Sequence, residues 1–574
     1  MRQARIYLRN NMSKIPLIVF DHFFFKYDAQ QEPTLKDINL TIYEGEKVLI
    51  LGQSGSGKST MVHCMNGLVP YSIKGHTEGS LTIAGVDTSH TSIFRLSQSV
   101  GTVLQDSDAQ FVALSVEEDV AFALENKAMS KKDMIPMVHA AVKKVGMFHF
   151  LKQVPFRLSG GQKQKVALAG ILHEDVKLLL FDEPLASLDP VSNLRTIEMI
   201  DEMHEDGKTV IIVEHRFEDV LHRKVDRVVV IDEGSIVFDG DVNTLLQNDI
   251  LRHYGLREPL YVQALRMAKI DLKGLKLDQV GDVDFKKYKQ ELAFLNTPQE
   301  VIEDPQRSPL VEFKQVHFSY DDLKALDDIS FTLYKGERLA LVGRNGAGKS
   351  TLAKLMVGAL RPDQGTVEIS GKNYTAYSIA EIASRIGYVM QNPNQMIVKH
   401  MIKDEVSLAL KIRKYTPEAI ETAVTEALTV TGLQSMSHWP VSALSYGQKK
   451  RLTVASILAL KPEVLILDEP TAGQDYRHYT EIMDFLESIN KTLGITFIFI
   501  THDIHLAIEY TDRALVFSEG KLIRDARIFT ALSDQSILEQ ASLTQTSLYT
   551  LALECGFEPE RVIENFILHR GLYA

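Results

Sequence analysis

The sequence predicts an α/β protein in which one domain occurs twice. The segment GQSGSGKST at residues 52–60 recurs as GRNGAGKST at residues 343–351, each between a short apolar strand and a helical pattern. Four later residues recur at an offset of 286 or 287: Gln105 and Gln391, Ser159 and Ser445, Asp182 and Asp468, and His215 and His502. Because the units of solenoid repeats run only to about 50 residues, this offset indicates a duplicated globular domain.

Length and composition bound the functions that the chain can have. Its 574 residues carry a net charge of −12, with 45% hydrophobic and 24% charged residues, which is ordinary for a globular protein. The acidic balance disfavours a nucleic-acid partner, since binding to phosphates requires a basic surface. With only two cysteines, Cys64 and Cys555, a disulfide framework, a zinc site or an iron–sulfur cluster is not expected.

No stretch of the sequence predicts a membrane span or a secretory signal. The apolar strands, such as ITFIFI at residues 495–500, are far shorter than the ~20 residues of a membrane helix. The basic N-terminal stretch at residues 1–11 lacks the apolar core of a secretory signal. We therefore assign no function to this extension.

The two glycine-rich segments are typical of phosphate-binding P-loops. Small residues let such a loop wrap closely round a triphosphate, and its N–H groups and the following helix N-terminus face the anion. Lys58 and Lys349 are placed to reach the β/γ oxygens, and Ser59 and Ser350 to ligate Mg²⁺. The expected ATP-binding residues of the loops are Gly52, Ser54, Gly55, Gly57, Lys58, Ser59 and Thr60, and in the second copy Gly343, Asn345, Gly346, Gly348, Lys349, Ser350 and Thr351.

Two pairs of residues near the loops have more than one interpretation. Tyr27 and Tyr320 end strand-like segments, where the ring either stacks on adenine or is merely half-buried. Gln105 and Gln391 end apolar runs and are either sensors of the metal site or ordinary turn residues. Their recurrence in both copies favours the sensor.

A second turn suited to anions follows the helical pattern that starts near residue 112. The segments LSGGQ and LSYGQ place small residues at a helix start, where backbone N–H groups face outward. We expect this turn in each copy to close over the nucleotide of the other copy, so that two nucleotides are sandwiched head to tail. Tyr446 replaces the first glycine in the second copy and is expected to alter that site. The expected ligands are Ser159, Gly160, Gly161 and Gln162, and Ser445, Gly447 and Gln448.

Each copy then carries two carboxylates at the end of an apolar strand, followed by a histidine. Asp182 is expected to complete the Mg²⁺ shell, and Glu183 to orient or deprotonate the attacking water. His215 ends the next strand, within reach of the γ-phosphate. The second copy keeps the equivalent catalytic set, Asp468, Glu469 and His502. The expected metal ligands are Ser59, Gln105, Asp182, Ser350, Gln391 and Asp468.

In this order, the loop, glutamine, LSGGQ turn, acidic pair and histidine resemble the ATP-binding cassette (ABC) ATPases. The resemblance implies two tandem P-loop NTPase domains, each with a RecA-like core, an antiparallel β portion and a helical subdomain. The implied ranges are an extension at 1–13, domain 1 at 14–255, a helical appendage and linker at 256–308, domain 2 at 309–540 and a helical appendage at 541–574. It also implies composite sites, in which the first loop and acidic pair face Ser445 and Gly447, and the second face Ser159 and Gly161.

A narrower resemblance follows each sensor glutamine. QDSDAQFVALSVEEDVAFALEN and QNPNQMIV are similar to segments of energy-coupling factor (ECF) transporter ATPases, with Gln110 and Gln395 at the family's second glutamine. The second copy is one residue shorter there, and the first lacks the family's proline. The resemblance implies a Mg²⁺-dependent ATPase on the cytoplasmic face of the membrane. Its partners would be a transmembrane coupling subunit and a small substrate-binding membrane protein for a vitamin, a vitamin precursor or a transition-metal ion.

Two other classes of tandem ATPase are alternatives. The soluble ribosome-associated class joins its cassettes through a long basic helix, whereas residues 270–308 carry both charges almost equally. The tandem sugar-importer class usually has a degraded second site, whereas GRNGAGKST and LDEP are intact here. The sequence therefore favours the ATP-hydrolysing motor of an importer.

Overall fold

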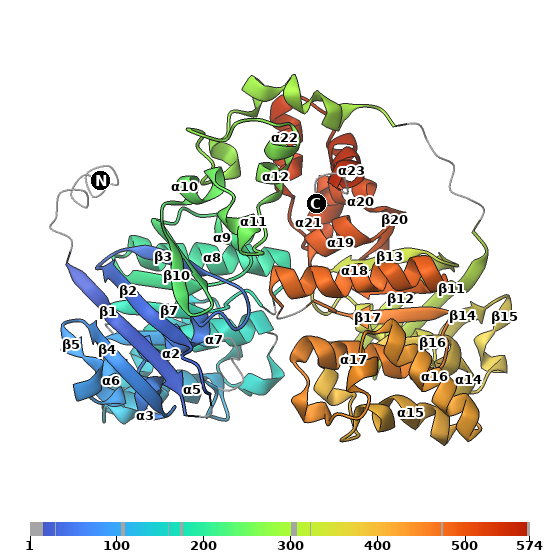
Figure 1. Cartoon of the computed structure of the whole chain (residues 1–574), viewed down its shortest axis with the longest axis horizontal. Helices are drawn as coiled ribbons and strands as arrows, with labels where there is room; N and C mark the ends of the chain where they lie inside the picture. Colours follow the sequence, from blue (N-terminus) through green and yellow to red (C-terminus); the bar gives the residue numbers. More distant parts are fainter. Residues whose placement is uncertain are drawn as a thin grey trace. The chain divides into compact units, whose positions relative to one another are not determined.

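The computed structural model describes residues 15–28, 30–104, 110–158, 160–172, 176–186, 188–299, 307–321, 323–471 and 474–570. The chain divides into two compact units, which are mostly blue to green and mostly yellow to red in Figure 1, although the second unit also includes the green residues 264–270 and 284–299. The first comprises Met1–Leu188, Ser192–Gln263 and Asp271–Val283, and the second comprises Asp189–Val191, Ala264–Ile270 and Asp284–Ala574. Within the described ranges, we find no helix that combines the length and the apolar character needed to cross a membrane.

The helices and strands of the first half are, in order, β1 (Pro16–Tyr27), β2 (Leu35–Tyr43), β3 (Lys47–Leu51), α2 (Lys58–Met65), α3 (Leu68–Tyr71), β4 (Gly75–Ile83), β5 (Val86–Asp87), α4 (Ile93–Ser97), β6 (Val100–Val103), α5 (Val116–Asn126), α6 (Lys131–Lys144), α7 (Gly160–Leu172), β7 (Leu178–Asp182), α8 (Pro190–Glu205), β8 (Thr209–Val213), α9 (Phe217–Val220), β9 (Arg227–Asp232), β10 (Ser235–Gly240), α10 (Val242–Gln247), α11 (Ile250–His253) and α12 (Leu260–Met267).

Those of the second half are β11 (Pro309–Tyr320), β12 (Leu323–Tyr334), β13 (Arg338–Gly343), α13 (Lys349–Met356), β14 (Gln364–Ile369), β15 (Lys372–Asn373), α14 (Ile379–Arg385), β16 (Ile386–Val389), α15 (Ile402–Ile412), α16 (Pro417–Val430), α17 (Tyr446–Leu458), β17 (Val464–Asp468), α18 (Tyr476–Leu493), β18 (Thr496–Ile500), α19 (Ile504–Tyr510), β19 (Arg513–Ser518), β20 (Lys521–Arg527), α20 (Ile528–Ser533), α21 (Gln535–Ala541), α22 (Ser547–Cys555) and α23 (Pro559–Arg570).

Each unit contains a six-stranded core sheet and a four-stranded antiparallel sheet. The core sheets have the orders β6-β7-β8-β3-β9-β10 and β16-β17-β18-β13-β19-β20, parallel except for the last strand of each. The antiparallel sheets have the orders β2-β1-β4-β5 and β12-β11-β14-β15. The matching orders confirm the predicted duplicated α/β fold.

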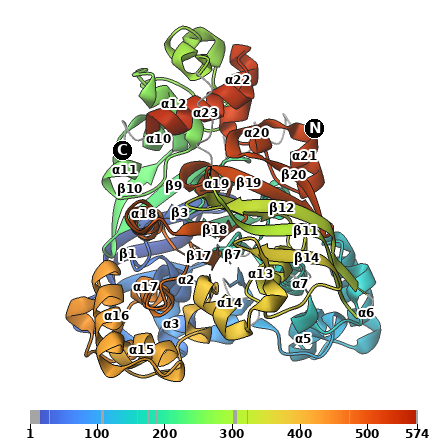
Figure 2. The same cartoon turned by 90° about the vertical axis from the view of Figure 1, so that its right-hand side faces the viewer.

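The central core strands are buried on both faces, which explains their unbroken apolar sequence. In β17, Val464 and Ile466 pack in a cluster with the antiparallel sheet and α13. Leu465 and Leu467 point to the other face and pack in a cluster with α15, α16, α17 and α18. Figure 2 shows β17 and β18 between these layers. The alternation of side chains along one strand therefore gives the unit two clusters, one on each face of the core sheet.

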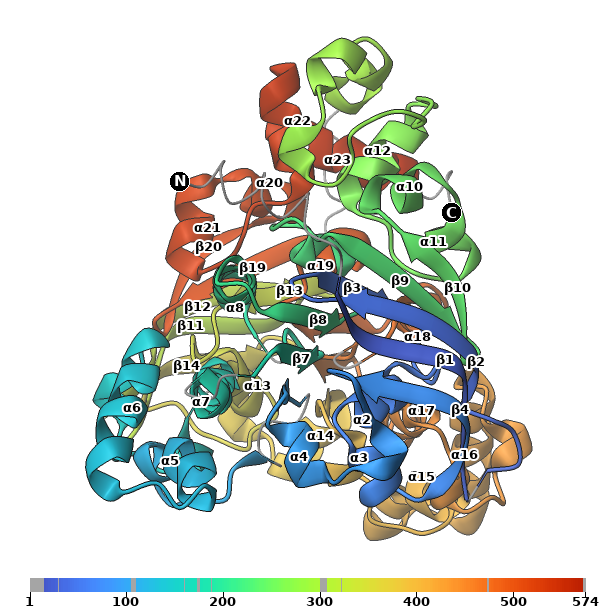
Figure 3. The same ribbon diagram turned by 90° about the vertical axis from the view of Figure 1, so that its left-hand side faces the viewer.

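The predicted helical subdomains are present in both copies. In the first unit, α5, α6 and α7 pack against one another (Figure 3). In the second, α15, α16 and α17 form the equivalent group. Helix α17 also contacts β16, and α7 contacts β6. Each subdomain thus links the LSGGQ-type turn to the strand that precedes the sensor glutamine.

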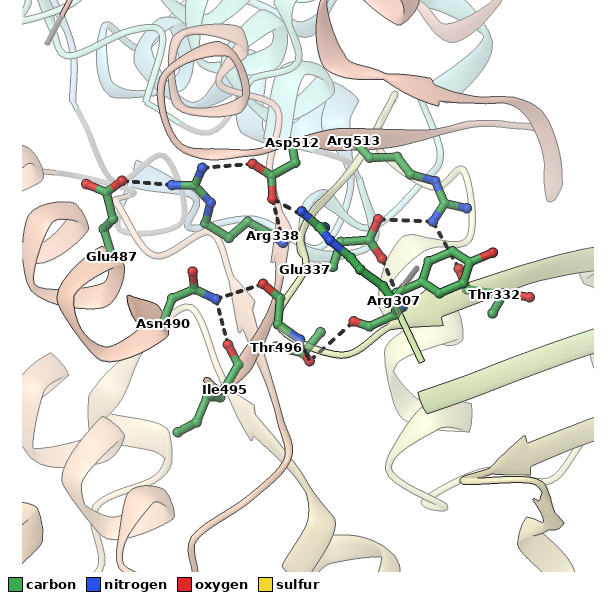
Figure 4. Close-up of polar contacts among 12 residues, drawn as sticks. Arg307, Thr332, Glu337, Arg338, Glu487, Asn490, Ile495, Thr496, Asp512 and Arg513 are labelled. Carbon is green, nitrogen blue, oxygen red and sulfur yellow. Dashed lines mark hydrogen bonds and ion pairs between the residues drawn. The ribbon is translucent and has the colours of Figure 1, made fainter. Parts of the chain in front are cut away.

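A polar network joins the amino ends of the parallel strands in the second unit (Figure 4). Arg338 begins β13 and donates hydrogen bonds to Glu487 of α18 at 2.9 Å and to Asp512 at 2.8 Å. Arg513 begins β19 and donates to Glu337 at 3.1 Å. Bidentate guanidinium groups suit this position, because each one satisfies carboxylates from two chain segments at once. The network fixes the edge of the sheet opposite the P-loop.

The first unit builds the same edge with a different cation. Lys47 begins β3, is fully buried, and pairs with Asp201 of α8 at 2.8 Å. Burial lowers the pKa of Lys47, and the bond to Asp201 opposes that shift. Arg227, the counterpart of Arg513, forms an ion pair with Asp239 at 2.5 Å. The two copies of the domain therefore both have ion pairs at the amino ends of their core strands, although Lys47 stands in the first copy where Arg338 stands in the second.

The predicted linker does not behave as a free connection in its second half. Residues 284–299 belong to the second unit, where the 3₁₀ helices η6 (Phe285–Tyr288) and η7 (Glu291–Asn296) contact α22 and α23. Phe285, Leu292 and Leu295 are buried. Asn565 of α23, also buried, donates to the carbonyl oxygens of Leu295 at 3.1 Å and Thr297 at 2.9 Å. The sequence analysis predicted a linker here because the segment carries both charges, although it also contains these spaced apolar residues.

Replacing Asn565 with alanine should loosen this docked segment, because it leaves buried carbonyl groups without their donor, at a cost of about 1–3 kcal/mol. Cys555 reports the change: its thiol contacts the Phe285 carbonyl, and burial raises its pKa to about 11, so few thiolates react in the native state. We expect iodoacetamide labelling of Cys555, followed by peptide mass spectrometry, to accelerate severalfold. Leu568→Ala, at an exposed position of the same helix, should leave the rate unchanged. Equal rates in the two variants would contradict this role of Asn565.

Candidate functional site

Both P-loops lie at the carboxyl ends of the middle strands of the core sheets. β3 pairs with β8 and β9, and β13 with β18 and β19, so each loop leaves the sheet between two neighbours. The loops turn into α2 and α13 through Gly57 and Gly348, whose φ values of 109° and 102° favour glycine. A Cβ on Gly52 would lie 2.3 Å from the carbonyl oxygen of Ile231, so close packing also requires glycine there.

The loop lysines turn back onto their own loops. The Lys58 ammonium donates to the carbonyl oxygens of Gly52 and Gln53, both at 2.7 Å. Lys349 donates to Gly343 at 2.5 Å and to Arg344 at 2.9 Å. Burial lowers the pKa of Lys349. A buried cation held beside a helix N-terminus provides a site for an anion such as a phosphate.

The remaining loop residues divide into an outer and an inner set. The side exposed to solvent carries Ser54, Gly55 and Ser59 in the first copy and Asn345, Gly346 and Ser350 in the second. Thr60 is buried, and its counterpart Thr351 is half-buried. The predicted serine ligands thus lie on the open side of each loop, next to the buried lysine.

In the first unit, the Asp182 carboxylate ends β7 beside the P-loop. Burial raises its pKa to about 6, while the charge of Lys58 and a hydrogen bond from Ser59 oppose the shift. One of its oxygens, Oδ1, is buried and has no hydrogen-bond partner among the described residues. A carboxylate and a hydroxyl at one point fit Mg²⁺, which takes few protein ligands alongside phosphate oxygens and waters.

The predicted base, Glu183, follows directly. Its backbone φ of 49° is in the left-handed region, and its N–H donates to the carbonyl oxygen of Val213 at 2.8 Å. Burial, followed by the negative charge of Glu214, raises the pKa of Glu183 to about 7. The imidazole Nδ1 of His215 lies 3.8 Å from the Glu183 carboxylate. The predicted acidic pair and histidine therefore share one corner of the first unit.

The second unit has the same corner with shorter contacts. Nδ1 of His502 lies 2.6 Å from a Glu469 oxygen, and the hydroxyl of Thr501 donates to the other oxygen at 3.4 Å. The Tyr388 hydroxyl donates to Asp468 at 2.5 Å. Burial raises the pKa of Asp468. In this corner, His502 and Thr501 therefore both contact the Glu469 carboxylate.

Glu214 is a site residue that the sequence analysis missed. It stands immediately before His215, where the second copy has Thr501, and is completely buried. Its carboxylate accepts the N–H groups of Leu185, which follows the predicted base, and of His215. The signal was available in the sequence, since VEHR and ITHD differ by a charge at an otherwise apolar strand end.

The two predicted adenine tyrosines have different surroundings. The hydroxyl of Tyr27 lies 2.8 Å from that of Thr60 in α2, and its ring makes an edge contact with Phe25. Tyr320 makes an equivalent edge contact with Phe318 and is 39% exposed. Tyr27 is therefore tied to the P-loop helix, whereas Tyr320 offers more of its ring to a ligand.

The second-copy LSYGQ turn is closed by its own side chains. Ser445 caps α17 by accepting the N–H of Gln448, and the Gln448 side chain accepts the N–H of Ser445, which forms a capping box. The Tyr446 hydroxyl donates to the carbonyl oxygen of Gln391 at 3.3 Å, and its ring lies 5.6 Å from the Lys450 ammonium. Gly447 is the second residue of the helix. Tyr446 thus connects the turn to the sensor glutamine of its own unit.

The first-copy turn is described only in part. Gly160, Gly161 and Gln162 form the first turn of α7. A Cβ on Gly161 would lie 3.2 Å from Leu188, so little space remains there. Two predicted residues, Gln105 and Ser159, lie outside the described ranges.

The two predicted coupling glutamines do not occupy equivalent positions. Gln110 accepts the N–H of Leu104 at 3.0 Å and donates to Thr102. In the second copy, the N–H of Met390 meets the sulfur of Met396 instead, while Gln395 is exposed. Further on, Asp119 accepts the N–H of Val112, and Glu405 that of Val398, both at the unchanged offset of 286. The second copy is therefore not shorter here, and Met396 is the counterpart of Gln110.

Together, a P-loop with its buried lysine, a strand-end carboxylate pair and a histidine define a nucleoside-triphosphate site, and the chain has two. The ABC transporter family model matches residues 35–186 and 326–472, and a model described as ATP-binding cassette cobalt transporter matches residues 248–318. The chain belongs to the ABC transporter ATP-binding proteins, whose cassettes bind ATP.

Similar proteins span the whole chain. A protein from Vibrio parahaemolyticus, named as an ABC transporter ATP-binding protein, is 48% identical to this chain over 546 residues, which cover 94% of each of the two chains. A protein of the same name from Enterococcus faecalis is 48% identical to this chain over 561 residues, which cover 97% of this chain and 99% of the relative. A solved structure of CbiO1 from Clostridium perfringens, described as part of the ABC transporter complex CbiONQ, is 33% identical and covers 40% of this chain and 94% of its own, with a TM-score of 0.38.

Tyr446→Gly restores the residue of the first copy and removes the contact with Gln391. We expect it to lower the KM for ATP roughly threefold, because without the tyrosine side chain the backbone N–H groups of the turn regain access to phosphate. Loss of the hydrogen bond from the Tyr446 hydroxyl to Gln391 costs only about 1 kcal/mol. Tyr446→Phe keeps the ring over Lys450 and is the matched control, with a smaller change expected. Steady-state ATPase kinetics measure both. Kinetics unchanged in both variants would make the substitution neutral.

Proposed function

We propose that the chain is the ATP-hydrolysing, energy-coupling subunit of an ECF-type importer for a vitamin, a vitamin precursor or a transition-metal ion. The observation that carries the proposal is that both copies keep a complete lysine, carboxylate pair and histidine. The cobalt-transporter family match at residues 248–318 supports the ECF assignment. A ribosome-associated ATPase is not favoured, because the matching families and relatives are named as transporter components.

In the proposed reaction, each unit holds ATP through its P-loop. Lys58 or Lys349 binds the β/γ oxygens, and Ser59 with Asp182, or Ser350 with Asp468, would hold Mg²⁺, which neutralises phosphate charge when bound. Glu183 or Glu469 orients and deprotonates the attacking water. His215 or His502 contacts the γ-phosphate. The pKa of about 7 for Glu183 suits a group that accepts a proton near neutral pH.

We further propose that the two units pair, so that the LSYGQ turn completes the first site and the LSGGQ turn the second. Each turn offers backbone N–H groups at a helix start, and each P-loop presents its exposed serine toward solvent. ATP binding would favour the paired state, and hydrolysis would release it. Such a cycle converts the free energy of ATP into movement of a membrane partner.

The proposed docking site for the coupling subunit is the segment that follows Gln110. Val112 and Leu114 are 63% and 81% exposed, and in the second copy Val398 is 65% exposed. The Asp119 carboxylate holds the backbone N–H groups of Val112 and Ala113, so the apolar side chains are presented on a fixed backbone. This site would place the chain peripherally at the cytoplasmic face of the membrane, against the coupling subunit and its small substrate-binding protein.

Glu183→Gln and Glu469→Gln remove the proposed bases without changing side-chain shape. We expect each to reduce ATP turnover at least about tenfold, since a positioned base contributes roughly 10²–10⁴-fold to such a step, while nucleotide binding persists. Turnover and binding of a fluorescent ATP analogue are measured on the purified chain. Near-normal turnover in the double variant would overturn the catalytic assignment.

Leu114→Asp places a charge in the proposed docking site. Because the side chain is 81% exposed, the fold should tolerate the change, but burial of an unpaired carboxylate against a partner should weaken docking. We expect the fraction of chain that sediments with native membranes to fall severalfold, with basal ATPase unchanged. Leu568→Asp, at the exposed face of α23, is the matched control. Equal sedimentation of both variants would place the partner elsewhere.

A further inference from the structure

Glu214 joins the two catalytic loops of the first unit. Its Oε1 accepts the N–H of Leu185 at 2.9 Å, in the segment directly after Glu183. Its Oε2 accepts the N–H groups of His215 at 3.0 Å and Arg216 at 3.2 Å. One completely buried carboxylate therefore fixes the backbone on both sides of the proposed base and histidine.

The second unit closes its corner with a neutral residue. The hydroxyl of Thr501 accepts the N–H of Asp503 at 2.9 Å and donates to Glu469 at 3.4 Å. Nδ1 of His502 then lies directly on Glu469, at 2.6 Å. In the first unit, Nδ1 of His215 lies at nearly equal distances from Glu183 and Glu214, 3.8 and 3.9 Å. The two corners thus differ in the residue that precedes the histidine, which is a buried carboxylate in the first unit and a threonine hydroxyl in the second.

Burying a carboxylate is costly unless hydrogen bonds compensate for its lost hydration. Threonine at the same position satisfies one backbone N–H at much lower cost, as the second unit demonstrates. Burial of Glu214 therefore costs more free energy than burial of threonine, and we ask which contacts Glu214 makes that threonine does not. That difference is the link between two loops and a second anionic neighbour for His215.

We propose that Glu214 is a positioning residue that makes the two ATP sites non-equivalent. It holds the Glu183 segment and the His215 loop in one geometry and draws the imidazole away from the base. In that geometry, Glu183 orients the water and His215 meets the γ-phosphate. In the second site, His502 and Thr501 both bind the base itself, so this corner must rearrange before Glu469 can act. The inference rests on the proposed roles of Glu183 and His215.

The test replaces Glu214 with the second-copy residue in the full-length chain. Glu214→Thr should lower kcat for ATP roughly tenfold, because displacement of catalytic groups by less than an ångström has effects of this size. The KM for ATP should stay within twofold, since the P-loop is untouched. Glu214→Asp keeps both acceptor oxygens on a shorter side chain, so it should recover part of the lost kcat. Glu214→Gln keeps one acceptor oxygen and sets an NH2 group against a backbone N–H donor, so it should not recover it.

Thr209→Val is the matched control. Thr209 is buried at the opposite end of β8 and accepts the N–H of Gly45 at 2.8 Å, so the variant loses a buried bond on the same strand, far from the corner. We expect it to lower the melting temperature but not kcat. Should Glu214→Thr fail to fold, Glu214→Gln and Glu214→Asp carry the same kcat comparison.

The outcomes separate this inference from the proposed function. A kcat for Glu214→Thr equal to that of the native chain, or a fall no larger than that of Thr209→Val, would overturn the role of Glu214. Parallel changes in kcat and KM would also overturn it, because they indicate general distortion. If Glu183→Gln itself retains full turnover, the proposed catalytic site fails first. Loss of kcat in Glu214→Thr and Glu214→Gln, with partial recovery in Glu214→Asp, supports the inference.

Discussion

Parallel pairing of the central strands is the constraint on which both sites depend. β3, β8 and β7 run in the same direction with fixed register, as do β13, β18 and β17. Their carboxyl ends therefore meet at one edge, which brings the P-loop, the carboxylate pair and the histidine together from segments that are far apart in the sequence. Ion pairs of Lys47 in the first unit and Arg338 in the second hold the opposite edge. The direction of the parallel strands therefore determines where the site residues lie, and side-chain contacts only refine their positions.

The two copies share the arrangement of their core strands but differ in the residues around the carboxylate pair and the histidine. Glu214 and Thr501 occupy one position, yet the first clamps two loops and the second binds the base. Tyr446 links its turn to the sensor glutamine, where the first copy has Gly160. Because Glu214 and Tyr446 bond to segments that carry predicted site residues, we expect the two sites to differ in rate.

Much of the fold and of the site could be predicted from the sequence, because P-loops, acidic strand ends and strand-end histidines are local patterns. What escaped prediction depends on tertiary contacts. Glu214 looked like an ordinary strand residue until its three N–H donors from two loops were visible. The segment 284–299 looked like a charged linker because its buried residues are spaced irregularly. Gln395 was matched to Gln110 by residue type, whereas the backbone contact belongs to Met396.

The central claim is that the chain drives a membrane importer. The most direct test is affinity purification of the tagged chain from detergent-solubilised native membranes and from the soluble fraction, with identification of stoichiometric partners. The account predicts a polytopic membrane subunit together with a small membrane protein, whose bound ligand would name the solute. Recovery of ribosomes from the soluble fraction, without a membrane partner, would contradict it.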